Sequence, residues 1–389
     1  MTLNSNDAHV RPGCNNAGIT AEVREFYDSF SPQNTLSSKL LFYNELKSGF
    51  PSLKIPESTA KMTFGCLNPV SRLIDEFKSK NKKFSEPLNI LDAGGGAGFD
   101  LFLLKQIFPN ARVFNIDISH NLLKLGRGEF KDHLGLEVNK DGVYYICAEL
   151  SQLSAVNNIK FDYIISNAVF NLVADKRNAL KNISGLLKED GSFFLADIAF
   201  SGQSGRGPAE INHSIKDGIY YAPTIIPLSK YREIIFEFFG YNRILENKTV
   251  KPENIGGINA NFSIFCAHIK KNPPAEKEII TCACSNKIEL NVFLSVNAED
   301  WPCCIKMIIE RRLNSAFCPA CKRAYYDFIP YFFEWPQKNI AAHVFPASLK
   351  GQKDSLTTRL AMSGTRPADS IFFGYDEFRD FLIKKAATA

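Results

Sequence analysis

Short apolar runs alternate with stretches of helical spacing from residue 86 to residue 270. Runs typical of buried strands lie at residues 88–91, 111–116, 142–147, 161–166 and 191–196. Helical spacing of apolar residues is found at residues 99–108, 121–127, 179–187 and 231–239. Such alternation predicts an α/β fold, a Rossmann-like sheet whose parallel strands are joined by right-handed crossovers. Two further runs, at 241–247 and 260–269, are predicted to pair antiparallel at the sheet edge and bring the sheet to seven strands.

The segments on either side of this core have other patterns. Residues 1–19 are polar and aperiodic, so we expect a disordered tail, whereas residues 20–85 have helical spacing and predict a helical lid. Residues 271–277 are polar, contain two prolines and are interpreted as a linker. Residues 278–389 predict a small α+β domain of short strands around paired cysteines, which ends in a helix over 375–385.

Composition and charge limit the classes of function. The 389 residues exceed what one core usually fills, so we expect two domains. The net charge of +5 is mild, and no block of like charge indicates nucleic-acid binding. No apolar run approaches the ~20 residues that a membrane span needs. We therefore expect a cytoplasmic protein, monomeric or homodimeric, with no nucleic-acid or membrane partner.

A glycine-rich segment follows the first predicted strand, with Gly94, Gly96 and Gly98 behind Asp92. Glycines let the backbone turn tightly and approach a ligand closely. The spacing differs from the dinucleotide pattern G-x-G-x-x-G, and Asp92 would repel a pyrophosphate. A zwitterionic amino acid would be attracted instead, because its ammonium group pairs with a carboxylate.

Acidic residues at the ends of the next two strands complete a candidate cofactor site. Asp117, followed by Ile118, can accept hydrogen bonds from ribose hydroxyls, and Glu149 is placed to meet an adenine amino group. S-adenosylmethionine has an amino-acid zwitterion, a ribose and an adenine, and we predict it as the cofactor. Tyr27 on the lid could close over the methionine moiety, although a core tyrosine would have the same pattern. The candidate cofactor residues are Tyr27, Asp92, Gly94, Gly96, Gly98, Asp117, Ile118, Glu149 and Asn167.

Three segments together resemble class I S-adenosylmethionine-dependent methyltransferases: ILDAGGGAG at 90–98, NIDIS at 115–119 and LLKEDGS at 186–192. A narrower likeness lies in ISNAVFNLVADK at 165–176, which is similar to the S-N-C-V-x-N-L-x-x-D-K segment of arsenite methyltransferases. The segments EVREFY at 22–27 and FGCLNP at 64–69 also resemble that family. The likeness covers roughly residues 20–270 and implies the cofactor and the fold.

The chain departs from arsenite methyltransferases at the thiols that bind arsenic in that family. Cys66 matches the first cysteine, but Ala168 stands at the second, and the third aligns near Ser214. One thiolate does not chelate arsenite tightly, so a different acceptor is expected.

Methyl transfer from a sulfonium relies on positioning and desolvation, and a dedicated base is optional. Our catalytic candidates are Asn167, at the end of the fourth strand, and His213, whose type titrates near neutrality. Asn167 could equally cap the turn that follows it, His213 could lie on the surface, and Cys66 could simply pack. The candidate acceptor-pocket residues are Cys66, Asn171, Asp197 and His213.

Two close cysteine pairs lie in the C-terminal part, Cys282 with Cys284 and Cys318 with Cys321. Four thiolates from two turns are typical of a closed tetrahedral zinc site with a structural role. Cys303 and Cys304 are adjacent, so their joining this site is less expected. The layout resembles the CpXC domain over roughly residues 278–350, although the first pair lacks the proline of that family. The resemblance implies a zinc-ribbon-like module, which could recruit a carrier or partner protein.

We therefore expect an enzyme that methylates a small molecule, for example a biosynthetic intermediate, with S-adenosylmethionine. Two alternatives stay open: an arsenite or other thiophilic methyltransferase, and a non-catalytic zinc-ribbon protein that senses the cofactor.

Overall fold

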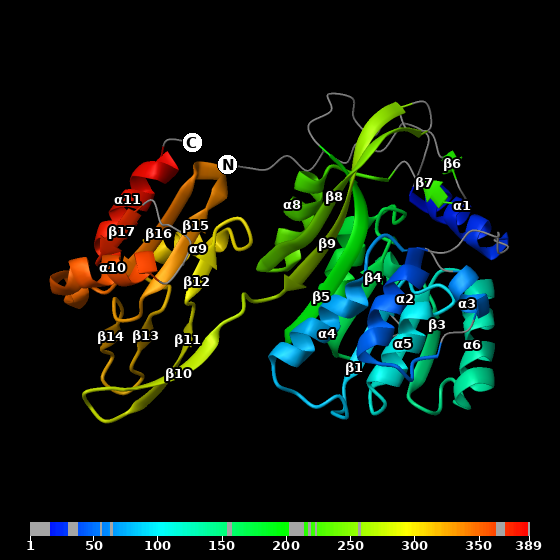
Figure 1. Cartoon of the computed structure of the whole chain (residues 1–389), viewed down its shortest axis with the longest axis horizontal. Helices are drawn as coiled ribbons and strands as arrows, with labels where there is room; N and C mark the ends of the chain where they lie inside the picture. Colours follow the sequence, from blue (N-terminus) through cyan, green and yellow to red (C-terminus); the bar gives the residue numbers. More distant parts are fainter. Residues whose placement is uncertain are drawn as a thin grey trace. The chain divides into compact units, whose positions relative to one another are not determined.

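The computed structural model describes residues 16–29, 38–54, 57–62, 65–153, 158–201, 214–216, 219–221, 224–255, 258–362 and 370–387. The chain divides into two units, Met1–Lys271 and Asn272–Ala389, which are described separately (Figure 1). The division falls within the polar segment that the sequence identifies as a linker. Strand β10 (Glu276–Thr281) already includes the last two residues of that segment.

The first unit contains a seven-stranded sheet in the order β3-β2-β1-β4-β5-β9-β8 (Figure 1). Its first five strands pair in parallel, and β9 and β8 join them antiparallel. The strands are β1 (Asn89–Ala93), β2 (Arg112–Asp117), β3 (Val143–Cys147), β4 (Phe161–Asn167), β5 (Leu187–Phe200), β8 (Tyr241–Ile255) and β9 (Ile258–Lys270). The strand order reverses between β1 and β4, which is where open α/β sheets bind ligands. The predicted seven strands and their mixed pairing are confirmed.

Helices cover both faces of this sheet. One apolar cluster joins α4 (Pro69–Ser79), α5 (Phe99–Ile107) and α6 (His120–Leu134) to one face, and a second joins α7 (Lys176–Leu186) and α8 (Leu228–Phe238) to the other. Because strands between two helical layers are buried on both sides, they are continuous apolar runs in the sequence. The other elements of this unit are α1 (Asn16–Ser29), α2 (Ser38–Gly49), α3 (Glu57–Lys61), β6 (Ser214–Lys216) and β7 (Ile219–Tyr221).

Some boundaries differ from the sequence-based expectation. Helix α1 begins at Asn16, and Ile19 is buried, so residues 16–19 belong to the lid and not to the expected tail. Strand β5 begins at Leu187, before the predicted run at 191–196, and it has an irregularity there, because Phe161 pairs with Leu187 while Tyr163 pairs with Ser192. Strand β8 runs well beyond its predicted run because it pairs with β9 as far as Ile255, with irregularities after Ile244 and Val250. Strand β9 closely matches its predicted run.

A polar cluster fixes α4 against the sheet. Glu76 accepts hydrogen bonds from Ser192 at 2.8 Å and Lys270 at 3.4 Å, and it forms ion pairs with Lys80 at 2.7 Å and His268 at 3.4 Å. Burial alone would raise the pKa of Glu76, but the hydrogen bond and charge of His268, with Lys270 and Lys80, hold that pKa well below its usual range. The ionised carboxylate therefore stabilises the fold above about pH 4.5, and this contribution decreases as the pH falls further.

Replacing Glu76 by glutamine should lower the free energy of unfolding by roughly 3 kcal/mol at pH 7, because it leaves buried cations without their carboxylate. Urea unfolding at several pH values measures the effect. The difference from the unmodified chain should shrink below about pH 4.5, where the native carboxylate begins to lose its advantage. Asp75→Asn on the exposed side of the same helix is the control, and a pH-independent difference for Glu76→Gln would contradict the assignment.

The second unit has three small sheets. Two-stranded ladders form between β10 and β11 (Lys287–Val292) and between β13 (Ala316–Phe317) and β14 (Ala324–Tyr325). The third has the order β12-β15-β16-β17, from strands Ser295–Asn297, Tyr331–Trp335, Ile340–Phe345 and Ser370–Phe373. Helix α11 (Tyr375–Ala387) buries Phe378 and Leu382, and it contacts α9 (Cys303–Ile309) and strands β16 and β17; α10 (Lys353–Met362) precedes β17. The predicted small α+β domain is confirmed.

Candidate functional site

The glycine loop connects β1 to α5 through three residues with positive φ. Gly94, Gly96 and Gly98 have φ values of +80°, +56° and +81°, a region that favours glycine. A Cβ atom on Gly94 would lie 2.4 Å from the methyl groups of Val169, so a side chain there would meet the facing loop. The backbone NH of Gly94 donates to the carbonyl of Ile116 at 2.7 Å, which ties the loop to the end of β2.

Asp117 stands where β2 ends, directly beside this loop. Its Oδ2 accepts from the backbone NH of Gly96 at 2.8 Å, and its Oδ1 accepts from the NH of Ser119 at 2.8 Å. A carboxylate has about four acceptor positions, so both oxygens can accept another hydrogen bond. Burial raises the pKa of Asp117, while these backbone donors act in the opposite direction.

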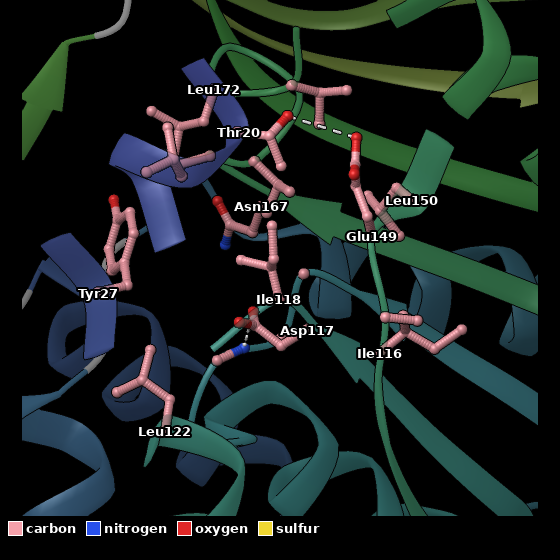
Figure 2. Close-up of a pocket in the computed structure, with 18 of the residues that line it drawn as sticks. Thr20, Tyr27, Ile116, Asp117, Ile118, Leu122, Glu149, Leu150, Asn167 and Leu172 are labelled. Atoms are coloured by element: carbon pink, nitrogen blue, oxygen red, sulfur yellow. Dashed lines mark hydrogen bonds between the residues drawn. The ribbon is translucent and has the colours of Figure 1, made fainter. Parts of the chain in front are cut away.

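A cavity opens over the loop, and Figure 2 shows its lining. It holds about 870 Å³ of empty space, counting the part open to solvent. Ligand pockets are typically roughly 300–1,000 Å³ and mostly apolar with a few polar groups. The polar lining includes Asp117, Glu149 and Asn167. Its apolar lining includes Val23, Met62, Ile116, Ile118, Leu122, Leu150, Val169, Leu172 and Val173.

Helix α1 lies over the cavity (Figure 2) and is attached near both of its ends. The hydroxyl of Thr20 donates to Glu149 Oε1 at 3.4 Å. At the other end, Asp28 accepts from the Ser119 hydroxyl at 2.7 Å, and its carbonyl accepts from the Asn121 side chain at 2.8 Å. The negative charge of Asp28 thus lies at the N-terminus of α6, where the helix dipole favours it. Helix α1 of the lid is therefore attached both to the segment that follows β2 and to the segment that follows β3.

The structure brings most of the predicted cofactor residues together in this cavity. The lining residues among them are Tyr27, Gly94, Gly96, Asp117, Ile118, Glu149 and Asn167. Asp92 is not among the lining residues; a Cβ atom on Gly95 would lie 2.4 Å from its Oδ2, so the carboxylate lies beneath the loop. Gly98 is also not among the lining residues; it is the N-cap of α5. A Cβ atom on Gly98 would lie 2.1 Å from the Tyr145 hydroxyl.

Asn167 uses its side-chain amide to hold the turn that precedes α4. Its Oδ1 accepts from the backbone NH of Cys66 at 3.0 Å, and its Nδ2 donates to the carbonyl of Leu67 at 2.9 Å. The Cys66 thiol also lies 3.5 Å from Oδ1. The turn that Asn167 holds precedes α4 and is not the turn that follows Asn167, and the residue also lines the cavity.

Of the predicted acceptor-pocket residues, the three in the described part of the chain do not line the cavity. Asn171 and Asp197 are buried, with 2% and 0% exposed, and neither lines the cavity; the backbone NH of Asn171 donates to Asp197 Oδ2 at 3.0 Å. Cys66 lies behind Asn167, and His213 lies outside the described residues. Ala168, which stands in the place of a family cysteine, lines the cavity with φ of +61°.

Most of the residues that the lid and the loop after β4 contribute to the lining were not predicted from the sequence. Thr20, Val23 and Met62 come from the lid, and Leu172 and Val173 come from the loop after β4. Their types match ordinary core residues, so no local signal marks them as cavity residues. Only the placement of α1 and of that loop over the glycine segment identifies them.

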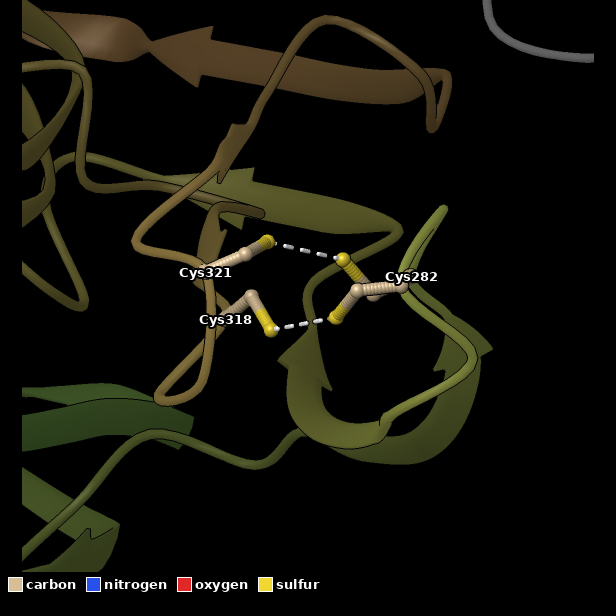
Figure 3. A group of neighbouring side chains, drawn as sticks. Cys282, Cys318 and Cys321 are labelled. Carbon is tan, nitrogen blue, oxygen red and sulfur yellow. Dashed lines mark hydrogen bonds between the residues drawn. The ribbon is translucent and has the colours of Figure 1, made fainter.

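In the second unit, four cysteine sulfurs converge from two turns (Figure 3). The Sγ atoms of Cys282, Cys284, Cys318 and Cys321 all lie within 4.8 Å of one another. Two of the separations are 3.4 Å, between Cys282 and Cys321, and 3.6 Å, between Cys284 and Cys318. Four thiolates at about 2.3 Å from a zinc ion would be about 3.8 Å apart, so the donor set fits a tetrahedral metal site.

The hydrogen bonds around the cluster act on its thiols in different directions. The backbone NH of Cys284, then the Tyr325 hydroxyl at 3.1 Å, lower the pKa of Cys282 to about 6. The backbone NH of Asn286 lowers the pKa of Cys284, but the hydrogen bonds with Cys282 and Cys318 outweigh it and raise that pKa to about 11. Tyr325 in turn accepts from the NH of Ala283 at 3.1 Å, which fixes its orientation. Such outer contacts commonly orient the ligands of a metal centre. Within the described residues, Cys303 is exposed and Cys304 is buried in α9, and neither belongs to the four-sulfur group.

Two family models match the chain. A methyltransferase-domain model matches residues 84–226, and a CpXC-protein model matches residues 280–375. The chain carries a class I methyltransferase domain and a CpXC domain. The CpXC match extends beyond residue 350, at which the resemblance seen in the sequence ended. It includes β15 and β16 and, beyond that residue, β17.

Curated relatives match parts of the methyltransferase domain. A malonyl-[acyl-carrier protein] O-methyltransferase of Acetivibrio thermocellus is 30% identical over 176 residues, which are 43% of this chain and 57% of the relative. The arsenite methyltransferase of Mus musculus is 26% identical over 117 residues, which are 29% of this chain and 31% of the relative. The chain thus spans about a third to somewhat more than half of the length of these relatives.

Among solved structures, an arsenic (III) S-adenosylmethionine methyltransferase from Chlamydomonas reinhardtii aligns with 59% of this chain and 75% of its own, at 18% identity and a TM-score of 0.45. Among the described residues, no helix has both the length and the apolar character needed to cross a membrane.

Proposed function

We propose that the methyltransferase domain binds S-adenosylmethionine over its glycine loop and transfers the methyl group to a small molecule, for example a biosynthetic intermediate. One observation carries the proposal: Asp117 lies between the glycine loop and the start of α6, and both of its oxygens keep acceptor capacity at the cavity. The domain match supports the cofactor class.

The cavity has suitable partners for each part of the cofactor. Asp117 would accept hydrogen bonds from the ribose hydroxyls. Glu149, at the β3 end and beside Leu150, would accept from the adenine amino group. The backbone of Gly94 and Gly96 would approach the methionine part, with Tyr27 facing it from the lid. Asp92 contributes a negative charge beneath the loop on this side.

When bound, the cofactor supplies an electrophilic methyl group with a good leaving group. The residues of the chain then have to orient the two reactants and exclude water. The apolar lining and the lid, attached at Glu149 and at Ser119, are suited to exclusion of water. Among the described residues, the titratable side chains that line the cavity are Tyr27, Asp117 and Glu149, which we assign to the cofactor, and this chemistry does not require a dedicated base. His213 remains a candidate for that role.

Arsenite is a less suitable acceptor. Of the cysteine positions that the arsenite methyltransferase family uses, Ala168 lines the cavity without a thiol, and the Cys66 thiol contacts the Asn167 side chain.

A carrier-bound acceptor is the second candidate, because the relative from Acetivibrio thermocellus is a methyltransferase of an acyl-carrier protein. In that case the CpXC domain would be the place to look for carrier binding.

We also propose that the four cysteines of the CpXC domain hold one structural zinc ion. Support comes from the sulfur geometry and from the lack of an open position, since all four ligands are protein thiolates. Such a site stabilises its domain and takes no part in methyl transfer.

The acceptor class can be tested with cofactor that carries an isotopic label in its methyl group. The chain is incubated separately with a small-molecule extract, with arsenite plus thiol, and with malonyl-charged acyl-carrier protein. We expect label in the small-molecule pool. Label on arsenic that Cys66→Ser abolishes, or label only on the carrier, would replace the proposed acceptor. Bound cofactor with no transfer to any pool would favour a sensing protein.

A further inference from the structure

The loop between β4 and α7, residues 168–175, forms one wall of the cavity. It supplies Ala168, Val169, Leu172 and Val173 to the lining. Because it faces the glycine loop, its position decides how closely Val169 approaches Gly94. The residues that hold this loop therefore control the shape of the cofactor site without touching it.

Asp197 on β5 holds the middle of this loop from behind. It is 0% exposed, and its Oδ2 accepts from the backbone NH of Asn171 at 3.0 Å and from the Tyr231 hydroxyl at 2.8 Å. Its Oδ1 accepts from the NH of Ile198 at 2.7 Å. The carbonyl of Asn171 accepts from the Thr224 hydroxyl, so the Asn171 residue is held through both backbone polar groups.

Lys176 holds the end of the same loop. It is the first residue of α7, is 6% exposed, and its ammonium donates to the carbonyl of Val173 at 2.8 Å. Its charge also acts favourably on Asp197. A buried carboxylate and a buried ammonium are costly unless they are paired and hydrogen-bonded. Here both bond to the backbone of one loop that lines the cavity.

We propose that Asp197 is a positioning residue which, with Lys176 and Tyr231, holds the 168–175 loop in its cofactor-binding form, so that cofactor affinity depends on the ionisation of Asp197. The inference rests on the proposed function, because it requires that the cavity binds the cofactor. It differs from the sequence-based hypothesis for Asp197, which placed that residue in the acceptor pocket.

The charge of Asp197 is sensitive to pH because of its surroundings. Burial raises its pKa, while the NH of Ile198, the Tyr231 hydroxyl and the Lys176 charge oppose this effect. The groups facing it are Lys176 from α7 and Tyr231 from α8, and Cys66 acts on Tyr231 from the lid side. Burial lowers the pKa of Lys176 to about 7, against the charge of Asp197, so Lys176 gains its charge over the same pH range in which Asp197 loses its own. Protonation would weaken the acceptor for the NH of Asn171 and release the loop.

The test is calorimetric titration with S-adenosylhomocysteine from pH 8 to pH 5.5, with thermal unfolding of every variant to verify folding. We expect the affinity of the unmodified chain to fall about tenfold over this range, as for one lost hydrogen bond.

Tyr231→Phe removes one donor to the carboxylate and should move the midpoint of the fall upward by about one pH unit. Asp197→Asn should bind weakly already at pH 8, with only the acid step of Asp117 remaining. Lys181→Met, on an exposed position of α7, is the control.

An unchanged midpoint in folded Tyr231→Phe would overturn the inference, even if its stability were lower, because a purely structural role shifts stability without moving the midpoint. If Asp197→Asn does not fold, the pH midpoint of cofactor binding in Tyr231→Phe is sufficient to test the inference. Absence of binding at every pH in the unmodified chain would instead reject the proposed cofactor site, so the two failures are distinguishable.

Discussion

Replacing Asp117 by asparagine is expected to weaken binding of S-adenosylhomocysteine by about 1–3 kcal/mol, which is about five- to 150-fold. Asparagine keeps the size of the side chain but replaces one acceptor oxygen with a donor. One oxygen of Asp117 already accepts from Gly96 and the other from Ser119, so an amide nitrogen at either place would face a backbone NH. The hydrogen bond that holds the glycine loop and the proposed hydrogen bonds to the ribose should therefore be weakened together.

Titration calorimetry measures this effect, with Asp132→Asn on the exposed surface of α6 as the matched control. In the unmodified chain, affinity should also fall on acidification. Burial raises the pKa of Asp117, so its carboxylate protonates at a higher pH than that of an exposed aspartate. If Asp117→Asn bound as tightly as the control, the ribose would have to lie elsewhere.

Replacing Cys318 by serine is expected to remove the proposed zinc and to unfold the CpXC domain, while the methyltransferase domain stays folded. Cys318 is buried, and it belongs to both the four-sulfur group and the apolar cluster of Ile288, Leu290 and Val292. Because structural zinc sites contribute directly to folding, a missing thiolate should affect the whole module. The zinc content measured by elemental analysis should fall from about one ion per chain to a small fraction of that.

Cys303→Ser is the matched control, since Cys303 is exposed in the same domain and lies outside the four-sulfur group. It should keep its metal and its thermal transition. A chelator should reproduce the Cys318→Ser phenotype in the unmodified chain. Metal content and unfolding that are equal in both variants would contradict a structural metal site at the four cysteines.

The sequence allowed the fold to be predicted because its signals are local and repeated. Alternating apolar runs and helical spacing identify the α/β sheet. Close cysteine pairs within a short segment identify the four-sulfur group, since each pair needs only one tight turn. Asp117 and Glu149 were found for a similar reason: they stand at strand ends, and the carboxyl ends of parallel strands share one edge.

Other parts of the site depend on tertiary packing that no local pattern shows. Asn171 and Asp197 were predicted at the acceptor pocket, but Asn171 is buried within the 168–175 loop, and Asp197 accepts from its backbone NH from behind the loop. Asp92 lies under Gly95, because the loop turns over it. The lining residues Val23 and Leu172 have the type of ordinary core residues, and only the position of the lid shows their role.

The central claim is that the cavity over the glycine loop is an S-adenosylmethionine site, and a structure determined with S-adenosylhomocysteine tests it most directly. The account predicts ribose hydroxyls within hydrogen-bond distance of Asp117, the adenine amino group near Glu149 and the amino-acid part against Gly94 and Gly96. Density for the ligand outside this cavity, or a ribose directed away from Asp117, would contradict it.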